Sequence, residues 1–330
     1  MSVARRVGIA AGTLGGVAGL AYGLQRLAAT RMRRAPDGDA RRALDAPGYL
    51  DHRLETHDRG TIYVVERGDE LDPPIVLSHG VTLSVRTWFH QLEELPKEGF
   101  RTIAFDHRGH GRSVLGQEGH SLENLGRDVK TVLEGLDLHG AVLVGHSMGG
   151  VAVQSFVTRF PEVAAERVAG IVLLSTLAYT PFGSRSTRTK ARLERISKRA
   201  PDAQLLWDAP NLGFLAARVG FGKNPHPSHV ELVRTMMSEC PPETRRDAPR
   251  VLVGLDLTRE LPNVRIPTLV VGGTADVLTP SFEARRIAGL IPGARLELLR
   301  GGGHMLMLER TDELDRLIVD FAREVRAQAP

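Results

Sequence analysis

Residues 141–150, AVLVGHSMGG, contain the feature that decides the fold of this chain. An apolar run leads into a serine, Ser147, which lies between Gly145 and Gly149 and precedes a helix-compatible run. G-x-S-x-G on a strand, a sharp turn and a helix is the setting that exposes a nucleophilic serine, and the glycines leave room for the turn. The stretch therefore predicts Ser147 as a nucleophile. The alternative is a serine that only caps the following helix.

Strand-like and helix-like segments alternate through most of the sequence. Short apolar runs end in glycine or polar turns, and helices are expected at Ser121–Leu136, Met148–Phe160 and Ser281–Leu290 and from Thr311 onward. This alternation predicts an α/β fold, with a mostly parallel central sheet and helices on both faces. At the third of these helices, Thr279 followed by Pro280 predicts a threonine cap before a first-turn proline.

The alternation fails from Thr176 to about Pro262. A helical cap is expected there, inserted before the strand TLVVGG that leads to Asp276. Its apolar and aromatic stretch LWDAPNLGFLAARVGFG suits the wall of an acyl pocket, although core packing explains the same residues. The basic stretch SRSTRTKARLERISKR, 184–199, is either a solvated helix face or a surface for anionic lipid headgroups.

A nucleophilic serine needs a base, and the base needs an orienting acid. His304 lies in the glycine loop GGGHMLMLE between the last strand and the last helix, and Asp276 directly follows a buried strand. The chain order serine, acid, histidine is the order that this motif requires. The side chain of His146, next to the serine, is expected to point away from it. The acids Asp208 and Asp256 fall in the cap and fit less well.

Two backbone amides are expected to bind the negative charge that develops on the substrate oxygen. Met148 directly follows the serine, and the second amide comes from the loop after an earlier strand, SHGVTLS. Val81 is the predicted donor there, with Thr82 as the alternative. Gly80 lets that backbone approach closely, and His79 is expected to be structural.

Histidine pairs elsewhere raise the question of a metal. His107/His110 and His226/His229 each have a spacing of three residues, but neither pair has cysteine or carboxylate partners at zinc-motif spacing. No metal and no cofactor is therefore expected. The single cysteine, Cys240, excludes an intrachain disulfide.

Together these motifs resemble the α/β-hydrolase fold family, in its capped esterase, lipase and peroxidase-like branch. The matching segments are HG at 79–80, DHRGHGRS at 106–113, GHSMGG at 145–150, GTADVLTP at 273–280 and GGGHMLMLE at 301–309. The resemblance implies an acyl-enzyme route with Ser147, His304 and Asp276, and a structural role for the loop DHRGHGRS. Epoxide hydrolases and haloalkane dehalogenases carry aspartate at the nucleophile position, so Ser147 argues against both.

The N-terminus differs in character from the rest. Residues 1–50 hold eight arginines and three aspartates, a balance of +5, which leaves −1 for the remainder of a chain whose net charge is +4. The near-neutral remainder shows no nucleic-acid footprint. The 18 uncharged residues Val7–Leu24 predict a membrane anchor within residues 1–30, followed by a linker at 31–47 and the hydrolase domain at 48–330. Flanking arginines favour a cytoplasmic catalytic domain. A cleaved signal peptide and a cytosolic tail are the alternatives.

The expected function is hydrolysis of carboxylic esters, with lipophilic esters favoured and a small-molecule or lipid ester as the partner. The same residues can also serve C–C bond hydrolysis, thioester or amide cleavage, acyl transfer or cofactor-free peroxidation. The alternative outside the enzymes is a non-catalytic binding protein with the same fold. The sequence does not indicate an oligomeric state.

Overall fold

The computed structural model describes residues 23–39, 49–180 and 204–328 of the chain. Within them, an eight-stranded sheet has the order β1-β2-β4-β3-β5-β6-β7-β8. The strands β1 and β2 pair antiparallel and β2 runs antiparallel to β4, whereas every pair from β4 to β8 is parallel. The strands are β1 Leu50–Glu55, β2 Thr61–Arg67, β3 Pro74–Ser78, β4 Arg101–Phe105, β5 Ala141–His146, β6 Val168–Leu174, β7 Thr268–Gly273 and β8 Arg295–Leu299. The expected mostly parallel sheet is confirmed.

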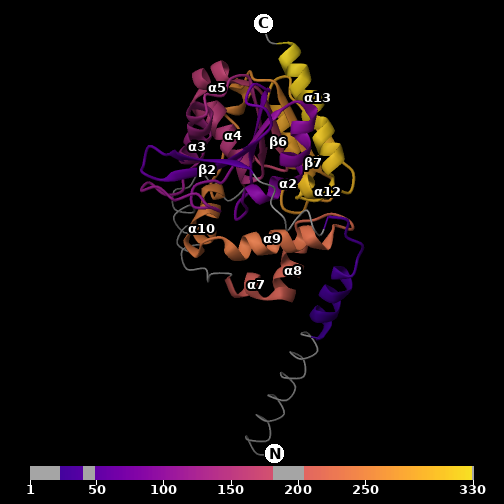
Figure 1. Ribbon diagram of the computed structural model, residues 1–330. Helices are drawn as coiled ribbons and strands as arrows, with labels where there is room; N and C mark the ends of the chain where they lie inside the picture. The colour runs from indigo at the N-terminus through magenta and orange to yellow at the C-terminus, as the bar shows by residue number, and fades with distance from the viewer. Residues whose placement is uncertain (1–22, 40–48, 181–203, 329–330) are drawn as a thin grey trace, which may run out of the picture.

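Helices connect the parallel strands and cover both faces of the sheet (Figure 1). The helices outside the cap are η1 Val85–Trp88, α2 Phe89–Glu94, η2 Leu95–Glu98, α3 Leu122–Gly135, α4 Met148–Arg159, α5 Pro161–Arg167, α11 Ser281–Leu290, α12 Leu306–Glu309 and α13 Thr311–Ala327. The expected helix at Ser281–Leu290 and the start of the last helix at Thr311 agree with the structure. Ser121 caps α3, because its side chain accepts a hydrogen bond from the amide of Asn124.

Alternate residues of the central strands enter two separate apolar cores. Val142 and Val144 of β5 pack with α2 and α13 on one face, while Leu143 packs with α3, α4 and α11 on the other. The period of two in a strand produces this division. Because both faces are buried, the parallel strands are apolar along their whole length, and this is the pattern that made them visible in the sequence.

The cap lies between β6 and β7, where the alternation of the sequence fails. Its described helices are α7 Gln204–Asp208, α8 Pro210–Arg218, α9 Pro227–Glu239 and α10 Pro242–Asp247, followed by the short turns η3 Ala248–Leu252 and η4 Leu261–Asn263. Figure 1 shows α7, α8 and α9 together at one end of the molecule. The basic stretch 184–199 lies outside the described residues.

Before the first strand, residues 23–33 form a helix that packs on the cap. The Arg33 guanidinium lies 4.4 Å from the centre of the Phe214 ring and donates a 2.8 Å hydrogen bond to Asn211. Further on, the Asp37 carboxylate accepts a hydrogen bond from the amide of Ser228 in α9. None of the helices described here is long and apolar enough to cross a membrane. Most of the uncharged run Val7–Leu24 lies outside the described residues.

Candidate functional site

Ser147 lies at a sharp turn between β5 and α4. Its backbone has φ 53° and ψ −117°, a left-handed conformation that is costly for any residue with a side chain. The turn is held on both sides, because the amide of Ser147 donates to the Leu174 carbonyl and its own carbonyl accepts from the Thr176 hydroxyl at 2.6 Å. This strained strand–turn–helix geometry is the one that the sequence motif predicts.

The glycines around Ser147 are required by space. A Cβ atom at Gly149 would lie 2.2 Å from the Ser78 carbonyl oxygen, and one at Gly145 would lie 2.5 Å from the Gly149 carbonyl oxygen. At Gly80 a Cβ atom would lie 2.9 Å from the His146 ring and 3.2 Å from Cβ of Ser147. These contacts let the loop after β3 approach the serine turn backbone to backbone.

Asp276 and His304 are brought together by the loops after β7 and β8. Nδ1 of His304 lies 2.9 Å from Oδ2 of Asp276. The other carboxylate oxygen of Asp276 accepts hydrogen bonds from the amides of Leu278 and Thr279, both at 2.8 Å. Burial tends to raise the pKa of Asp276, but the hydrogen bonds and charge of His304 and the bonds from Thr279 outweigh it and hold that pKa below its ordinary value. Asp276 is therefore an ionised acceptor for the histidine.

Thr279 belongs to this site, and the prediction that it caps the following helix is wrong. The expected helix cap does not form, since Pro280 occupies the cap position of α11 and no side chain caps the helix there. The Thr279 hydroxyl instead donates to Oδ2 of Asp276 at 2.7 Å and lies 3.1 Å from Nδ1 of His304. The hydroxyl thus donates to an ionised carboxylate, and such a charge-assisted hydrogen bond is stronger than one between two neutral groups.

Ser147 and His304 line the same cavity, which has a volume of about 340 Å³. No direct hydrogen bond joins their side chains within the described residues, and the Nδ1 atom of His304 faces Asp276 and Thr279. The cavity walls are mostly apolar, and the cap supplies Trp207, Val219, Val233 and Met237 among them. A larger cleft of about 660 Å³, beside Tyr63 and Arg86, contains neither Ser147 nor His304.

His146 also reaches this cavity, so its neighbourhood differs from the simple expectation that it points away. Its Nε2 lies 3.0 Å from the carbonyl oxygen of His304, and the two rings lie 4.7 Å apart. Burial, together with the nearby charge of His304, holds the pKa of His146 well below its ordinary value. A neutral, fully buried ring of this kind supports the histidine loop and is a poor proton acceptor.

The backbone amides of Val81 and Met148 donate no hydrogen bond to another described residue. Met148 is the first residue of α4, where an amide has no partner within the helix. Val81 follows Gly80 in the loop that approaches the serine turn, and it lines the cavity. At the alternative position, Thr82 has a positive φ of 61° and its hydroxyl donates to the Val81 carbonyl.

The loops after β3 and β4 are hydrogen-bonded to each other. His79 donates from Nδ1 to the Gly80 carbonyl and accepts at Nε2 from the amide of His107, which fixes its tautomer. Burial lowers the pKa of His79 to about 4, so the ring is neutral at neutral pH. Asp106 accepts from the amides of Val85 and Arg112, and burial raises its pKa to about 6.

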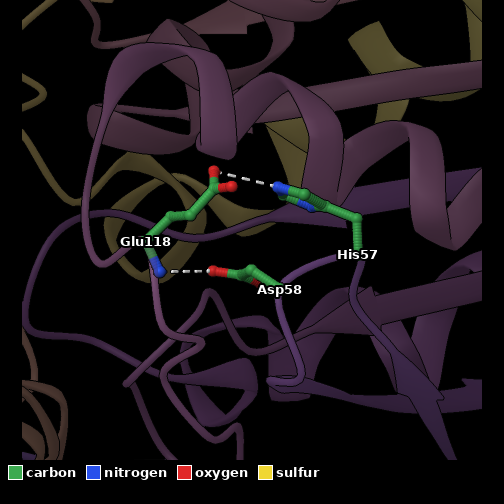
Figure 2. A group of neighbouring side chains, drawn as sticks. All are labelled: His57, Asp58 and Glu118. Carbon is green, nitrogen blue, oxygen red and sulfur yellow. Dashed lines mark hydrogen bonds and ion pairs between the residues drawn. The ribbon is translucent and has the colours of Figure 1, made fainter.

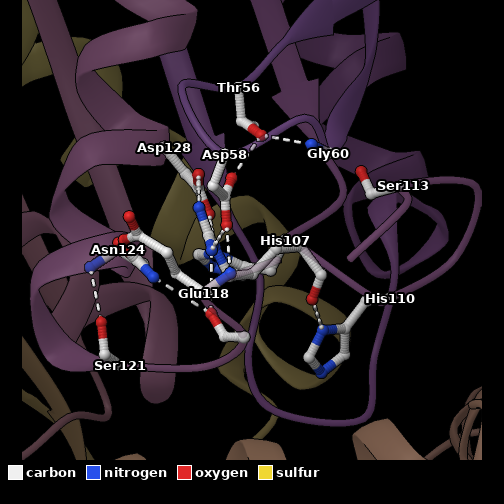
Figure 3. A network of polar contacts seen from close by, with 12 residues as sticks. Thr56, Asp58, Gly60, His107, His110, Ser113, Glu118, Ser121, Asn124 and Asp128 are labelled. Carbon is white, nitrogen blue, oxygen red and sulfur yellow. Dashed lines mark hydrogen bonds and ion pairs between the residues drawn. The ribbon is translucent and has the colours of Figure 1, made fainter. Parts of the chain in front are cut away.

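A buried ion network anchors the loop after β4 to the rest of the domain. Arg108 is fully buried, binds Asp128 of α3 through two nitrogens at 2.7 Å, and lies 3.1 Å from Asp58. Figure 3 shows Asp58 and Asp128 as parts of one polar network that also includes Thr56 and Asn124. A buried arginine with paired carboxylates fixes a geometry, because any lost partner leaves an uncompensated charge.

One group of three side chains in the described structure has the spacing of a metal site. Figure 2 shows His57, Asp58 and Glu118: the Glu118 carboxylate accepts a hydrogen bond from the His57 ring, and the Glu118 amide donates one to Asp58. Asp58, however, already accepts bonds from Thr56, from the Glu118 amide and from the cationic Arg108. A second cation beside that guanidinium would be repelled, so these residues do not fit a metal. Neither histidine pair noted in the sequence belongs to a group of three metal-capable side chains in the described structure.

Comparison with known proteins identifies the family. The chain matches the family model of the alpha/beta hydrolase fold over residues 73–311. It therefore belongs to the α/β-hydrolase family. It is 29% identical to a non-heme chloroperoxidase from Burkholderia pyrrocinia, over 82% of this chain and 99% of that protein. It is 28% identical to a bifunctional esterase/perhydrolase from Acinetobacter calcoaceticus, over the same shares of the two chains.

A solved structure supports the same fold. The esterase EaEST from Exiguobacterium antarcticum superimposes with a TM-score of 0.72 and 22% sequence identity, and the match covers 83% of this chain and 100% of that one. Relatives of this family include proteins named as esterases and as haloperoxidases, so the family alone leaves the reaction open.

Proposed function

We propose that the protein is a serine hydrolase that cleaves carboxylic esters through an acyl-enzyme. The observation that carries the proposal is the joint placement of Ser147 and His304 at one cavity, with Asp276 hydrogen-bonded to the far side of the histidine. In the first step the Ser147 hydroxyl attacks the ester carbonyl while His304 takes its proton. The histidine then gives that proton to the leaving alcohol, and Asp276 stabilises the transient imidazolium.

The second step returns the enzyme to its starting state. Water gives a proton to His304 and attacks the acyl group, the carboxylic acid leaves, and the proton returns to Ser147. The free amides of Val81 and Met148 are proposed to bind the oxyanion of both tetrahedral intermediates. Removing one such donor lowers rates by about 100- to 1,000-fold in enzymes of this kind.

The cavity supports an uncharged, lipophilic substrate. Among the described residues that line it, none has a charged side chain apart from the proposed base, and its volume of about 340 Å³ lies at the small end of the range of small-molecule sites. This favours esters whose acyl chain is of medium length and carries no charged group. Acetyl and butyryl esters would leave apolar wall uncovered.

A fluorophosphonate probe tests the proposal directly. It should form an adduct on the peptide that contains Ser147 in the wild-type protein, and no adduct should form in Ser147→Ala or after heat denaturation. Purified protein should then hydrolyse p-nitrophenyl octanoate with a higher kcat/KM than the acetate. Absence of the adduct in native wild-type protein would refute the serine mechanism, and activity confined to acetyl and butyryl esters would refute the lipophilic preference.

Perhydrolysis is the second candidate, and the names of the chloroperoxidase and the esterase/perhydrolase relatives favour it. Hydrogen peroxide would replace water in the second step and release a peracid, with the same acyl-enzyme and no cofactor. Halide oxidation in the presence of acetate and peroxide measures this activity. Its loss in Ser147→Ala would assign it to the same site.

We also propose that the uncharged run Val7–Leu24 attaches the protein to a membrane, with the hydrolase domain on the cytoplasmic side. Fractionation of cells that express the full chain tests this, because an anchored protein stays with membranes washed at high salt. Recovery of the full-length protein in the soluble fraction would contradict the anchor.

A further inference from the structure

The carboxylate of Glu309, at the end of α12, gathers three backbone amides from two distant segments. Its Oε2 accepts from Gly222 at 2.6 Å and from Gly303 at 3.1 Å, and its Oε1 accepts from Met305 at 3.0 Å. All three groups donate, which suits an ionised carboxylate. Burial raises the pKa of Glu309 above its ordinary value, although the three amides and the charge of Arg218 oppose this rise.

Two of the three amides that donate to Glu309 belong to the neighbours of His304 in the chain. Gly303 and Met305 flank His304, and the amide of His304 itself donates to the Gly220 carbonyl at 2.8 Å. Every amide from 303 to 305 is therefore bound, two of them to Glu309. The Glu309 carboxylate therefore holds the backbone on both sides of His304, and the Gly220 carbonyl holds the residue between them.

The third donor belongs to the cap. Gly222 lies in the connection between α8 and α9, and a Cβ atom on it would lie 2.2 Å from the Gly301 carbonyl oxygen. A Cβ atom on Gly303 would likewise lie 2.2 Å from the Gly222 amide. The cap connection and the histidine loop are thus packed backbone against backbone, with the Glu309 carboxylate closing the contact.

We infer that Glu309 is a positioning residue that holds His304 in place and couples it to the cap. The inference rests on the proposed function, in which His304 transfers protons. Proton transfer demands accurate placement, and a displacement of about 1 Å can lower a rate by about 100-fold. In Glu309→Gln one oxygen becomes an amide nitrogen that cannot accept, so at least one loop amide loses its partner.

The test compares kcat per titrated site in wild type, Glu309→Gln and Glu309→Asp, with Ser147 titrated by a fluorophosphonate. With p-nitrophenyl acetate and with the octanoate, kcat per site should fall by about 10- to 100-fold in Glu309→Gln. KM should rise for the octanoate alone, because we expect the longer chain to be the one that reaches the cap residues of the cavity wall. Glu309→Asp keeps the charge and should recover part of kcat. If Glu309→Gln does not fold, kcat per site and KM are compared between Glu309→Asp and wild type instead.

Glu313→Gln is the matched control. Glu313 lies one turn further on, in the first turn of α13, where it pairs with Arg310 at the surface, and its loss should change kcat by less than about two-fold. A merely structural role for Glu309 would reduce the number of titrated sites and leave kcat per site and KM unchanged, and that result overturns the inference. If wild-type protein is neither labelled nor active on either ester, the proposed function fails and the inference with it. If wild type is labelled and active and the variants match it, only the inference fails.

Discussion

The hydroxyl of Thr279 donates a 2.7 Å hydrogen bond to Oδ2 of Asp276, the same oxygen that faces the histidine ring. Because the hydroxyl lies 3.1 Å from Nδ1 of His304, the three groups form a compact triangle. The threonine thereby limits the rotation of the carboxylate and keeps one oxygen directed at the ring.

Replacing Thr279 by valine should lower kcat by about ten-fold with little change in KM. The substitution keeps the shape and removes a hydrogen bond to a buried carboxylate, a loss of about 1.4 kcal/mol or somewhat more. Steady-state kinetics on one ester measure the effect. Thr279→Ser retains the hydroxyl and should stay close to wild type, whereas equal losses in both variants would show that the methyl group matters instead.

Asp276→Asn should lower kcat by about 10,000-fold while the protein remains folded. The amide can present its NH₂ group to the histidine, which then carries its proton on the wrong nitrogen for accepting one from Ser147. Circular dichroism and ester hydrolysis report fold and rate on the same sample. Asp256→Asn, in the cap, serves as the control. A similar loss of kcat in that variant would contradict the assignment of Asp276 as the acid.

Trp207→Ala should shift chain-length preference towards longer acyl groups. Trp207 of α7 forms part of the cavity wall, and its removal adds space that a longer chain can fill. The ratio of kcat/KM for the hexadecanoate to that for the octanoate should rise by about ten-fold, which is the order of selectivity that hydrophobic pockets achieve. Leu205→Ala, a largely exposed position on the same helix, should leave the ratio unchanged. A parallel fall for all chain lengths would indicate a loss of folding instead.

The network at Asp58 predicts an acid-dependent stability. Burial opposes ionisation, but the Thr56 hydroxyl, the Glu118 amide and Arg108 together lower the pKa of Asp58 from 3.8 to about 2. A carboxylate whose pKa is lower in the folded state than in the unfolded state stabilises the folded protein at pH values above the unfolded-state pKa. This stabilisation is lost as the pH falls through the folded-state pKa. The stability that Asp58 adds should be complete above about pH 5 and should decline between pH 4 and 2.

Urea unfolding of wild type and Asp58→Asn at several pH values measures this contribution. The difference in unfolding free energy between the two proteins should shrink by about 2 kcal/mol over that range. Asp51→Asn, at an exposed position of the first strand, provides a comparison. A difference that stays constant with pH would show that Asp58 is not held ionised by its partners.

The sequence predicts most of this fold because the central strands are buried on both faces. Their apolar runs stand out, and the turns after them hold Ser147, Asp276 and His304 in the required order. The serine motif and its glycines can also be predicted locally, since the steric demands arise within a few residues. The roles of these residues in catalysis remain proposals for the experiments above.

Other features depend on contacts between distant residues, which periodicity does not reveal. The pair Thr279 and Pro280 has the pattern of a helix start, and only the folded structure shows that the threonine binds Asp276 instead. Glu309 looks like an ordinary helix residue until Gly222, 87 residues away in the chain, is seen to donate to it. The cap is hard to predict for the same reason, because its short helices pack on one another and on the N-terminal helix.

The close packing of Gly222 against Gly303 bears on how such enzymes can be recombined. A chimaera with the cap of one relative and the carboxy-terminal loop of another would place two backbones in close contact that do not pack together in either parent protein. The segments 220–222 and 301–309 therefore form one packed contact, although the strand that leads to Asp276 separates them in the chain. Chimaeras that exchange both segments together should keep their activity, and those that divide them should lose it.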